Sequence, residues 1–310
     1  MTEPRKVKHV LGLSGGKDSA ALAVYMARHY PEIDIEYFFT DTGKELPEVY
    51  DYLEQLEIIL GKPIAHINDK KGFDYWLEQH NNFLPAGRQR WCTIRMKLEP
   101  FEKWIKPYLE GGYEVISYVG IRADERFINE ETGDIEGRQG YVPNKSVQGS
   151  LKSKFPFWED GIKKQGVFDI LESAGLGLPK YYEWRSRSGC TFCFFQRKIE
   201  WVRLKEIHPE AFEEAKAYEK RAETSANGET FFWMGPNEPL ETLEDPDRIA
   251  EIKRNHEETQ ARFLKKKARE RKRKLGMHSM VDESMLIDTL DMDAMYDLEE
   301  GGGACITCYK

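Results

Sequence analysis

The sequence has no long apolar run and no excess of positive charge, and each absence excludes a class of protein. No segment approaches the roughly 18 consecutive apolar residues that a membrane-spanning helix needs. Acidic residues number 54 and basic residues 46, giving a formal net charge of −8, so any contact with nucleic acid must come from a local patch. The first ten residues lack the apolar stretch of a signal peptide. We therefore expect a cytoplasmic protein with no membrane partner.

Cysteine is scarce, with five residues in a chain of 310, which is too few for a disulfide-built scaffold. Four of the five form two C-x-x-C pairs, Cys190 with Cys193 and Cys305 with Cys308, and the fifth is Cys92. Without a secretory signal, this spacing predicts metal or redox chemistry more than structural disulfides.

Short apolar runs alternate with longer amphipathic ones through the first 120 residues, which is typical of a parallel sheet with crossover helices. The pattern predicts strands at 8–13, 33–39, 64–67 and 113–121, and helices at 18–29, 46–60, 72–81 and 94–110. It predicts further helices at 167–174 and 196–220, and a last long helix that opens at Asp245-Pro246 and runs to about Leu275. The fold class is therefore α/β.

The composition divides the chain into three expected parts. Residues 1–210 form the α/β domain with the cysteine segment, residues 211–275 a helical extension, and residues 276–310 a flexible acidic tail. A polar stretch at 129–149 predicts a surface loop that contacts the substrate. The run at 262–274 carries nine basic residues and one Glu, and two interpretations stay open. It could neutralise nucleic-acid phosphates, or it could be a solvated helix face that folds against the tail.

The strongest local signal is Ser14-Gly15-Gly16-Lys17-Asp18-Ser19, between a predicted strand and a predicted helix. The glycines let backbone amides approach an anion, the helix N-terminus adds its positive end, and Lys17 adds a full charge, which we expect on an exposed loop. The spacing is not that of a Walker A loop. We therefore predict a pyrophosphate-binding loop.

Five blocks in this order resemble the PP-loop ATP pyrophosphatases, within the phosphoadenosine-phosphosulfate-reductase-like branch. The blocks are SGGKDSAALAV from residue 14, Phe39-Thr40-Asp41-Thr42-Gly43, Arg90-Trp91-Cys92-Thr93 with Lys97, Gly120 to Glu125, and Phe155-Pro156 with Gly189-Cys190-Thr191-Phe192-Cys193. The resemblance covers about residues 8–210. It implies a Rossmann-like twisted parallel sheet with helices on both faces, similar to the adenine nucleotide alpha hydrolases.

The resemblance also implies that ATP is cleaved between its α- and β-phosphates, with Mg²⁺ neutralising the departing pyrophosphate. The implied nucleotide-binding residues are Ser14, Gly15, Gly16, Lys17, Asp18, Ser19, Asp41, Thr42, Gly43 and Arg122, of which Lys17, Asp18 and Arg122 are the catalytic candidates. Asp18 caps the loop or reaches Mg²⁺. Two alternatives remain: Asp41 could serve only a turn or helix cap, and Arg122 could clamp a phosphate or pair with Asp124 or Glu125.

The cysteines of the folded region suit a soft metal centre. A sealed zinc site needs four ligands, whereas a [4Fe-4S] cluster on Cys92, Cys190 and Cys193 would leave one iron open to sulfide, as in the related tRNA thiolases. The alternatives are zinc with a histidine or tail cysteine, and reduced thiols. Cys305 and Cys308, on a glycine tether, could be a mobile sulfur carrier or redox pair, could supply a fourth cluster ligand, or could have no role.

Together these features predict an enzyme that adenylates an oxygen of its acceptor so that sulfur can replace it. The resemblance is greatest to the PP-loop component of the bacterial Dnd and Ssp DNA-phosphorothioation systems. It implies nucleic acid, DNA more than tRNA, a cysteine desulfurase and other pathway proteins as partners. The alternatives are a reductase of phosphoadenosine phosphosulfate or adenosine phosphosulfate, the small subunit of sulfate adenylyltransferase, and a non-catalytic nucleotide-binding interaction module.

Overall fold

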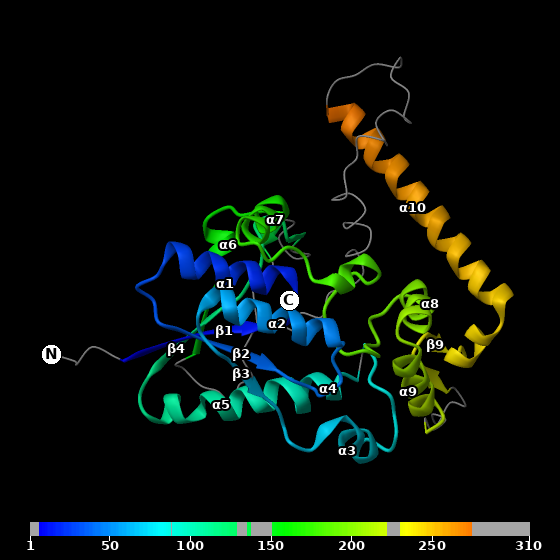
Figure 1. Cartoon of the computed structure of the whole chain (residues 1–310), viewed down its shortest axis with the longest axis horizontal. Helices are drawn as coiled ribbons and strands as arrows, with labels where there is room; N and C mark the ends of the chain where they lie inside the picture. Colours follow the sequence, from blue (N-terminus) through cyan, green and yellow to red (C-terminus); the bar gives the residue numbers. More distant parts are fainter. Residues whose placement is uncertain (1–5, 88, 129–134, 138–150, 222–229, 275–310) are drawn as a thin grey trace.

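The computed structural model describes residues 6–87, 89–128, 135–137, 151–221 and 230–274, and its centre is a five-stranded sheet (Figure 1). The strands are β1 (Val7–Leu13), β2 (Ile35–Thr40), β3 (Ile64–Ile67), β4 (Glu114–Tyr118) and β7 (Leu151–Lys154). They lie in the order β3-β2-β1-β4-β7, and every neighbouring pair is parallel. The predicted α/β fold is confirmed, and the sheet gains one edge strand, β7, that the sequence pattern did not indicate.

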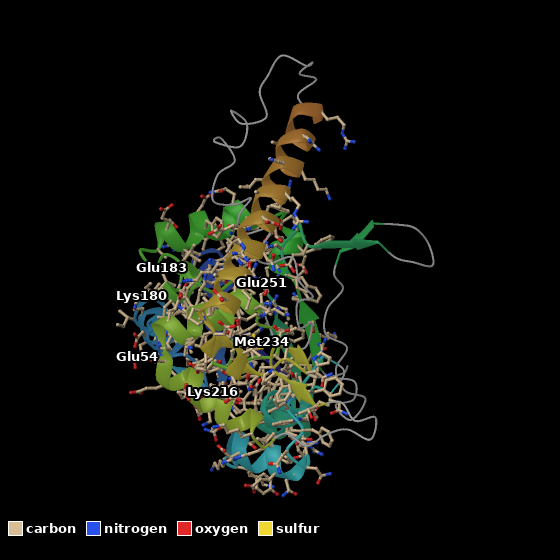
Figure 2. All side chains as sticks on the ribbon, turned by 90° about the vertical axis from the view of Figure 1, so that its right-hand side faces the viewer. Glu54, Lys180, Glu183, Lys216, Met234 and Glu251 are labelled. Atoms are coloured by element: carbon tan, nitrogen blue, oxygen red, sulfur yellow. The ribbon has the colours of Figure 1, made fainter. Side chains whose placement is uncertain are left out.

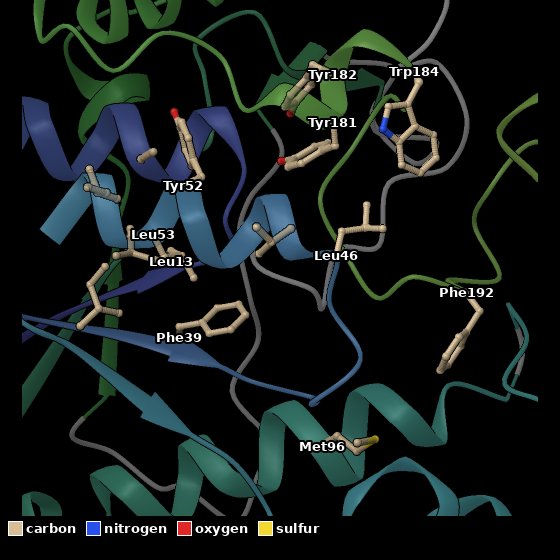
Figure 3. Packing of buried hydrophobic residues seen from close by; sticks show 14 of the residues in the cluster. Leu13, Phe39, Leu46, Tyr52, Leu53, Met96, Tyr181, Tyr182, Trp184 and Phe192 are labelled. Carbon is tan, nitrogen blue, oxygen red and sulfur yellow. The ribbon is translucent and has the colours of Figure 1, made fainter. Parts of the chain in front are cut away.

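Helices cover both faces of the sheet, as predicted (Figure 1). The helices α1 (Lys17–His29), α2 (Pro47–Leu60) and α7 (Lys164–Ser173) lie on one face, and α5 (Glu99–Glu110) lies on the other. Side chains alternate between the faces along each strand. Leu11 and Leu13 therefore join the cluster that includes α1 and α2, while Val10 joins the cluster around α5. Figure 3 shows Leu13 and Phe39 beside Leu53 of α2.

The strand order reverses direction between β1 and β4, which is where α/β sheets bind ligands. The chain proceeds from β1 outward to β2 and β3 on one side, and returns to β4 and β7 on the other. The segments that leave β1 and β4 at their carboxyl ends, 14–16 and 119–125, therefore emerge side by side. A Cβ on Gly120 would lie 2.9 Å from the carbonyl oxygen of Asp18, so these segments touch.

Several helices differ from the sequence prediction. Residues 72–81 form α3 (Gly72–Gln79), and the predicted helix at 94–110 is a π-helical turn, Ile94–Leu98, that continues α4 (Trp91–Thr93) into α5. The predicted helix at 196–220 is wrong as a single element, because it breaks into α8 (Lys198–Ile207) and α9 (Pro209–Glu219). Pro209 excludes the helical conformation at the residue before it, and His208 has φ −126° and ψ 66°.

The expected loop at 129–149 is wrong for residues 135–137. These residues form β6 (Ile135–Gly137), which pairs antiparallel with β5 (Arg126–Ile128). The rest of that stretch lies outside the described residues, as does the acidic tail with Cys305 and Cys308. The remaining short elements are α6 (Pro156–Glu159), a 3₁₀ turn at Lys180–Glu183, β8 (Phe231–Phe232), β9 (Gly235–Pro236) and a 3₁₀ turn at Leu240–Glu244.

The C-terminal part packs on the α/β core through α8, α9 and the segment up to the start of α10 (Pro246–Lys274). Trp233, Leu240 and Ile252 belong to the same hydrophobic cluster as Leu11 of β1, so one core continues across residue 210. The 29-residue helix α10 then extends away from the body (Figures 1 and 2), and it carries the basic run at 262–274. None of the helices in the described ranges has the length and apolar character to cross a bilayer.

Candidate active site

The loop between β1 and α1 is held in a conformation that favours glycine. Gly15 has a φ of +70°, in the left-handed region, and a Cβ there would lie 2.5 Å from Val49 Cγ1 of α2. The buried Tyr181 hydroxyl donates a hydrogen bond of 2.7 Å to the Gly15 carbonyl oxygen. A Cβ on Gly16 would lie 3.0 Å from Ser188 Oγ. The loop is therefore fixed between α2 on one side and residues 181–188 on the other.

The amides of this loop are satisfied only by its own hydroxyl groups. The Ser14 N–H donates to Ser19 Oγ at 3.2 Å, and the Gly16 N–H donates to Ser14 Oγ at 3.3 Å. Gly16 is the N-cap residue of α1 and supplies no side-chain cap. Because these hydrogen bonds are long and uncharged, a phosphate oxygen could replace the hydroxyl groups with shorter, charge-assisted bonds at a helix N-terminus.

Lys17 is buried, with 2% of its surface exposed, so the expectation of an exposed loop lysine is wrong. It is the first residue of α1, and its Nζ lies 3.3 Å from Asp18 Oδ2 and 5.1 Å from the centre of the Tyr182 ring. The tertiary fold covers it with the 3₁₀ turn at Lys180–Glu183, which the local sequence cannot reveal. Lys17 therefore presents its charge inside the site rather than to bulk solvent.

Arg122 forms a buried ion pair with Asp18, with 2.6 Å between Nη1 and Oδ1. Its guanidinium also lies 3.1 Å from Asp124 Oδ1 and 3.6 Å from Glu125 Oε1. Both carboxylates named in the alternative interpretation of Arg122 are thus present, together with a third that the sequence did not indicate. As placed, Asp18 is balanced by Lys17 and Arg122, which makes its carboxylate a weak additional ligand for Mg²⁺.

Asp41, Thr42 and Gly43 form the turn after β2. Asp41 Oδ1 accepts hydrogen bonds from the Gly43 N–H at 2.7 Å and from the Tyr50 hydroxyl at 2.8 Å, so the turn role considered for Asp41 is present. Burial and the hydrogen bond to Asp41 raise the pKa of Tyr50. Thr42 lines the pocket described below.

One pocket brings together the glycine loop and all three cysteines of the described chain. Its lining includes Ser14, Gly16, Lys17, Asp18, Thr42, Cys92, Lys97, Cys190 and Cys193. Ser188, two residues before Cys190, donates a hydrogen bond of 3.4 Å to Ser14 Oγ, so the loop and the cysteine segment are in direct contact. Gly15, Ser19, Asp41, Gly43 and Arg122 support this wall from behind and are not part of the lining.

The turn that carries Cys190 and Cys193 is fixed from two directions. The fully buried Arg185 donates hydrogen bonds to the Cys190 carbonyl oxygen at 2.8 Å and the Gly189 carbonyl oxygen at 3.3 Å. On the other side, the Thr191 N–H donates to the Lys44 carbonyl oxygen at 2.7 Å. Arg185 is a positioning residue that sequence reasoning missed, because nothing in the string RSRSGC distinguishes it from its neighbours.

The thiol of Cys190 lies against Thr42 and Glu45. Its Sγ is 3.2 Å from Thr42 Oγ1 and 3.7 Å from Glu45 Oε1. Burial, reinforced by the Glu45 carboxylate, holds the pKa of the Cys190 thiol well above its ordinary value. Burial also raises the pKa of Cys193, although Arg185 and two nearby cations oppose it. Both groups are therefore neutral thiols at pH 7 in the metal-free chain, and binding a metal would release their protons.

The donor set suits a soft metal, because three thiols face one pocket. In the ranges that the structure describes, no three His, Cys, Asp or Glu side chains converge closely enough to hold a metal ion. The residues thus fit an iron–sulfur cluster in type and location, while the thiols must still move together to bind one. The pocket also contains Tyr182, Arg187, Phe194 and Phe195, which the sequence patterns did not single out.

Comparisons with known proteins identify the domain that holds most of this site. The model of the phosphoadenosine phosphosulfate reductase domain matches residues 8–156. Residues 8–156 belong to the phosphoadenosine phosphosulfate reductase domain family. In this chain the reductase-family domain contributes the glycine loop and Cys92, and the segment beyond residue 156 contributes Cys190 and Cys193.

Three curated relatives are uncharacterised proteins. Two come from Methanocaldococcus jannaschii: one is 28% identical over 208 residues, covering 66% of this chain and 40% of the relative. The other is 27% identical over 207 residues, covering 64% of this chain and 44% of the relative, so the chain spans less than half the length of these two proteins. The third, a 37.8 kDa protein of Escherichia phage 186, is 24% identical over 278 residues, covering 74% of this chain and 80% of that protein.

Two solved structures are more distantly similar. One is the phosphoadenylyl-sulfate reductase of Candida auris in a phosphate complex, with 14% identity and a TM-score of 0.38, covering 59% of this chain and 78% of that one. The other is the U34-tRNA thiolase of Methanococcus maripaludis with its [4Fe-4S] cluster, with 17% identity and a TM-score of 0.39, covering 70% of this chain and 73% of that one. Scores this low do not bear on the activity of this chain.

Proposed function

We propose that this protein is an ATP pyrophosphatase that adenylates an oxygen of its acceptor so that sulfur can replace it, with DNA phosphorothioate modification as the pathway. The single observation that carries the proposal is the shared pocket. Lys17 and the N-terminus of α1 line the same pocket as Cys92, Cys190 and Cys193. A nucleotide site and a sulfur site in one pocket suit two successive displacements on one substrate atom.

The atoms balance without an oxidant or a reductant. The acceptor oxygen attacks the α-phosphorus of ATP, pyrophosphate leaves, and the oxygen becomes part of an adenylate. Sulfide, supplied by a cysteine desulfurase, then displaces AMP, which carries the former acceptor oxygen away. When the acceptor is a DNA phosphodiester, the displaced atom is a non-bridging backbone oxygen.

The chain's own residues have separate roles in this scheme. Lys17 and the amides of Ser14 and Gly16 bind the phosphates and stabilise the charge that develops on pyrophosphate, while Mg²⁺ accompanies the nucleotide. Cys92, Cys190 and Cys193 would hold a [4Fe-4S] cluster, which supplies an open iron for sulfide when bound. The Arg185 hydrogen bonds fix the turn that aims Cys190 into the pocket.

The test is pyrophosphate release from ATP by anaerobically purified protein, with DNA, tRNA, sulfate or no acceptor, together with the visible spectrum of the same sample. We expect release that DNA stimulates most, from a brown protein. Lys17→Ala should abolish release, whereas Lys62→Ala, which changes a surface lysine paired with Asp34, should retain it. Release unchanged in Lys17→Ala would refute the assignment of the loop.

The second candidate is a reductase of phosphoadenosine phosphosulfate or adenosine phosphosulfate, and the family of residues 8–156 favours it. A reductase acts on a nucleotide that is already activated, so it would consume that nucleotide and release no pyrophosphate from ATP. A coloured protein with this behaviour would replace the first proposal by the second.

A further inference from the structure

Two arginines flank one aromatic ring beside the cysteines. The Arg90 guanidinium lies 5.0 Å from the centre of the Phe195 ring, and the Arg187 guanidinium lies 5.6 Å from the same centre. Phe194 packs against Phe195, with 4.3 Å between the ring centres. All four side chains are half-buried, so their outer parts are accessible from solvent.

The ring orients the two guanidinium groups without neutralising them. A cation over an aromatic face is attracted to the ring, yet it keeps its charge and its N–H donors. Arg122 differs in kind, because three carboxylates surround its guanidinium. A pair of oriented guanidinium groups is suited to a phosphate, whose oxygens accept two parallel hydrogen bonds from each fork.

The location of this pair ties it to the sulfur half of the pocket. Arg187 and Phe195 line the pocket together with Cys190 and Cys193, and Arg90 is the N-cap residue of the helix that carries Cys92. The triplet therefore spans both cysteine-bearing segments. A phosphate bound there would lie beside the thiols and on the same pocket as Lys17.

We propose that Arg90 and Arg187, oriented by Phe195, form a second anion subsite that binds a backbone phosphate of the DNA acceptor. The proposal rests on the proposed function for the identity of the acceptor, and it adds the residues that recognise it. The subsite would place the phosphodiester to be modified between the nucleotide and the cysteines. Phe195 is a positioning residue here, while the two arginines contact the substrate.

The experiment measures binding of a labelled DNA oligonucleotide to the full chain, without ATP, over a series of salt concentrations. We expect Arg187→Gln and Arg90→Gln each to weaken DNA binding about tenfold. Each should also reduce the slope of log affinity against log salt by about 0.7 for single-stranded DNA or about 0.9 for a duplex. The matched control is Arg28→Gln, which changes an arginine bonded to Ser173 near the far end of α1 and should alter neither quantity.

Further variants separate recognition of phosphate from a structural role. Arg187→Lys keeps the charge and should keep the salt slope. Phe195→Leu should weaken DNA binding, and Phe195→Tyr should restore it, because a phenol ring orients the arginines equally well. Unchanged affinity and slope in Arg90→Gln and Arg187→Gln would overturn the proposal.

Two further outcomes would also overturn it. One is a loss of ATP binding in these variants with DNA binding intact, which would assign the arginines to the nucleotide. The other is weaker binding of tRNA with DNA binding intact, which would assign them to another acceptor. Because the assay contains no ATP, absence of pyrophosphate release would contradict the proposed function and leave the DNA measurement valid.

Discussion

The ion pair between Asp18 and Arg122 allows a quantitative test of what Arg122 does. Both side chains are buried, and Arg122 also faces Asp124 and Glu125. Removing the guanidinium in Arg122→Gln leaves three carboxylates close together with less positive charge to balance them. Breaking a buried pair in this way costs about 3–5 kcal/mol of unfolding free energy. We expect a loss of that size, measured by urea denaturation at neutral pH.

The double variant supplies the internal control. In Asp18→Asn with Arg122→Gln, the buried negative charge is removed together with its partner, so part of the loss should be recovered. The expected interaction free energy is about 0.5–3 kcal/mol, as is typical of residues in direct contact. Arg28→Gln, at a surface position, should change stability by less than about 0.5 kcal/mol.

One result would refute this reasoning about Arg122. If Arg122→Gln costs under about 1 kcal/mol while ATP-dependent turnover is lost, the guanidinium is a phosphate clamp that merely rests on Asp18 in the absence of nucleotide. If stability falls as expected and ATP binding in the folded fraction is intact, Arg122 acts by fixing the segment after β4 against the glycine loop.

Three other predictions concern the loop, the cysteines and a buried acid. Gly15→Ala should lose about 1–2 kcal/mol from backbone strain and more from contact with Val49, and Val49→Ala in the same chain should reduce that second part; additive losses in urea denaturation would contradict the packing. Cys190→Ser should lose the brown colour of the anaerobic protein, and equal absorption in variant and parent would contradict the cluster. Glu219, whose carboxylate accepts the Trp233 and Leu240 amides, has its pKa raised to about 7 by burial, so folding takes up a proton there above about pH 4.5. Its contribution to stability should therefore fall by roughly 3 kcal/mol as pH rises from about 4.5 to about 7, and urea midpoints of Glu219→Gln should lack that slope; equal slopes in both proteins would contradict it.

The sequence by itself determined the α/β class and the location of the glycine loop. The strands β1 and β2 are buried on both faces by helices, so each is an unbroken apolar run that the pattern detects. The edge strand β7 (LKSK) escaped prediction because it is short and only half covered. The break at His208 escaped because the helical pattern continues across Pro209, although the proline itself was visible.

The tertiary structure alone decided how the site is assembled. Sequence blocks identified residues 14–19, 92 and 190–193 separately, but only the fold shows that they line one pocket. Lys17 is buried because Tyr182 covers it from the other side of residue 160, and Arg122 has three carboxylate partners because the segments after β1 and β4 meet at the sheet reversal. Burial and charge pairing depend on contacts between distant segments. A pattern of neighbouring residues therefore locates the chemical groups, and the packing of the chain sets their charge and orientation.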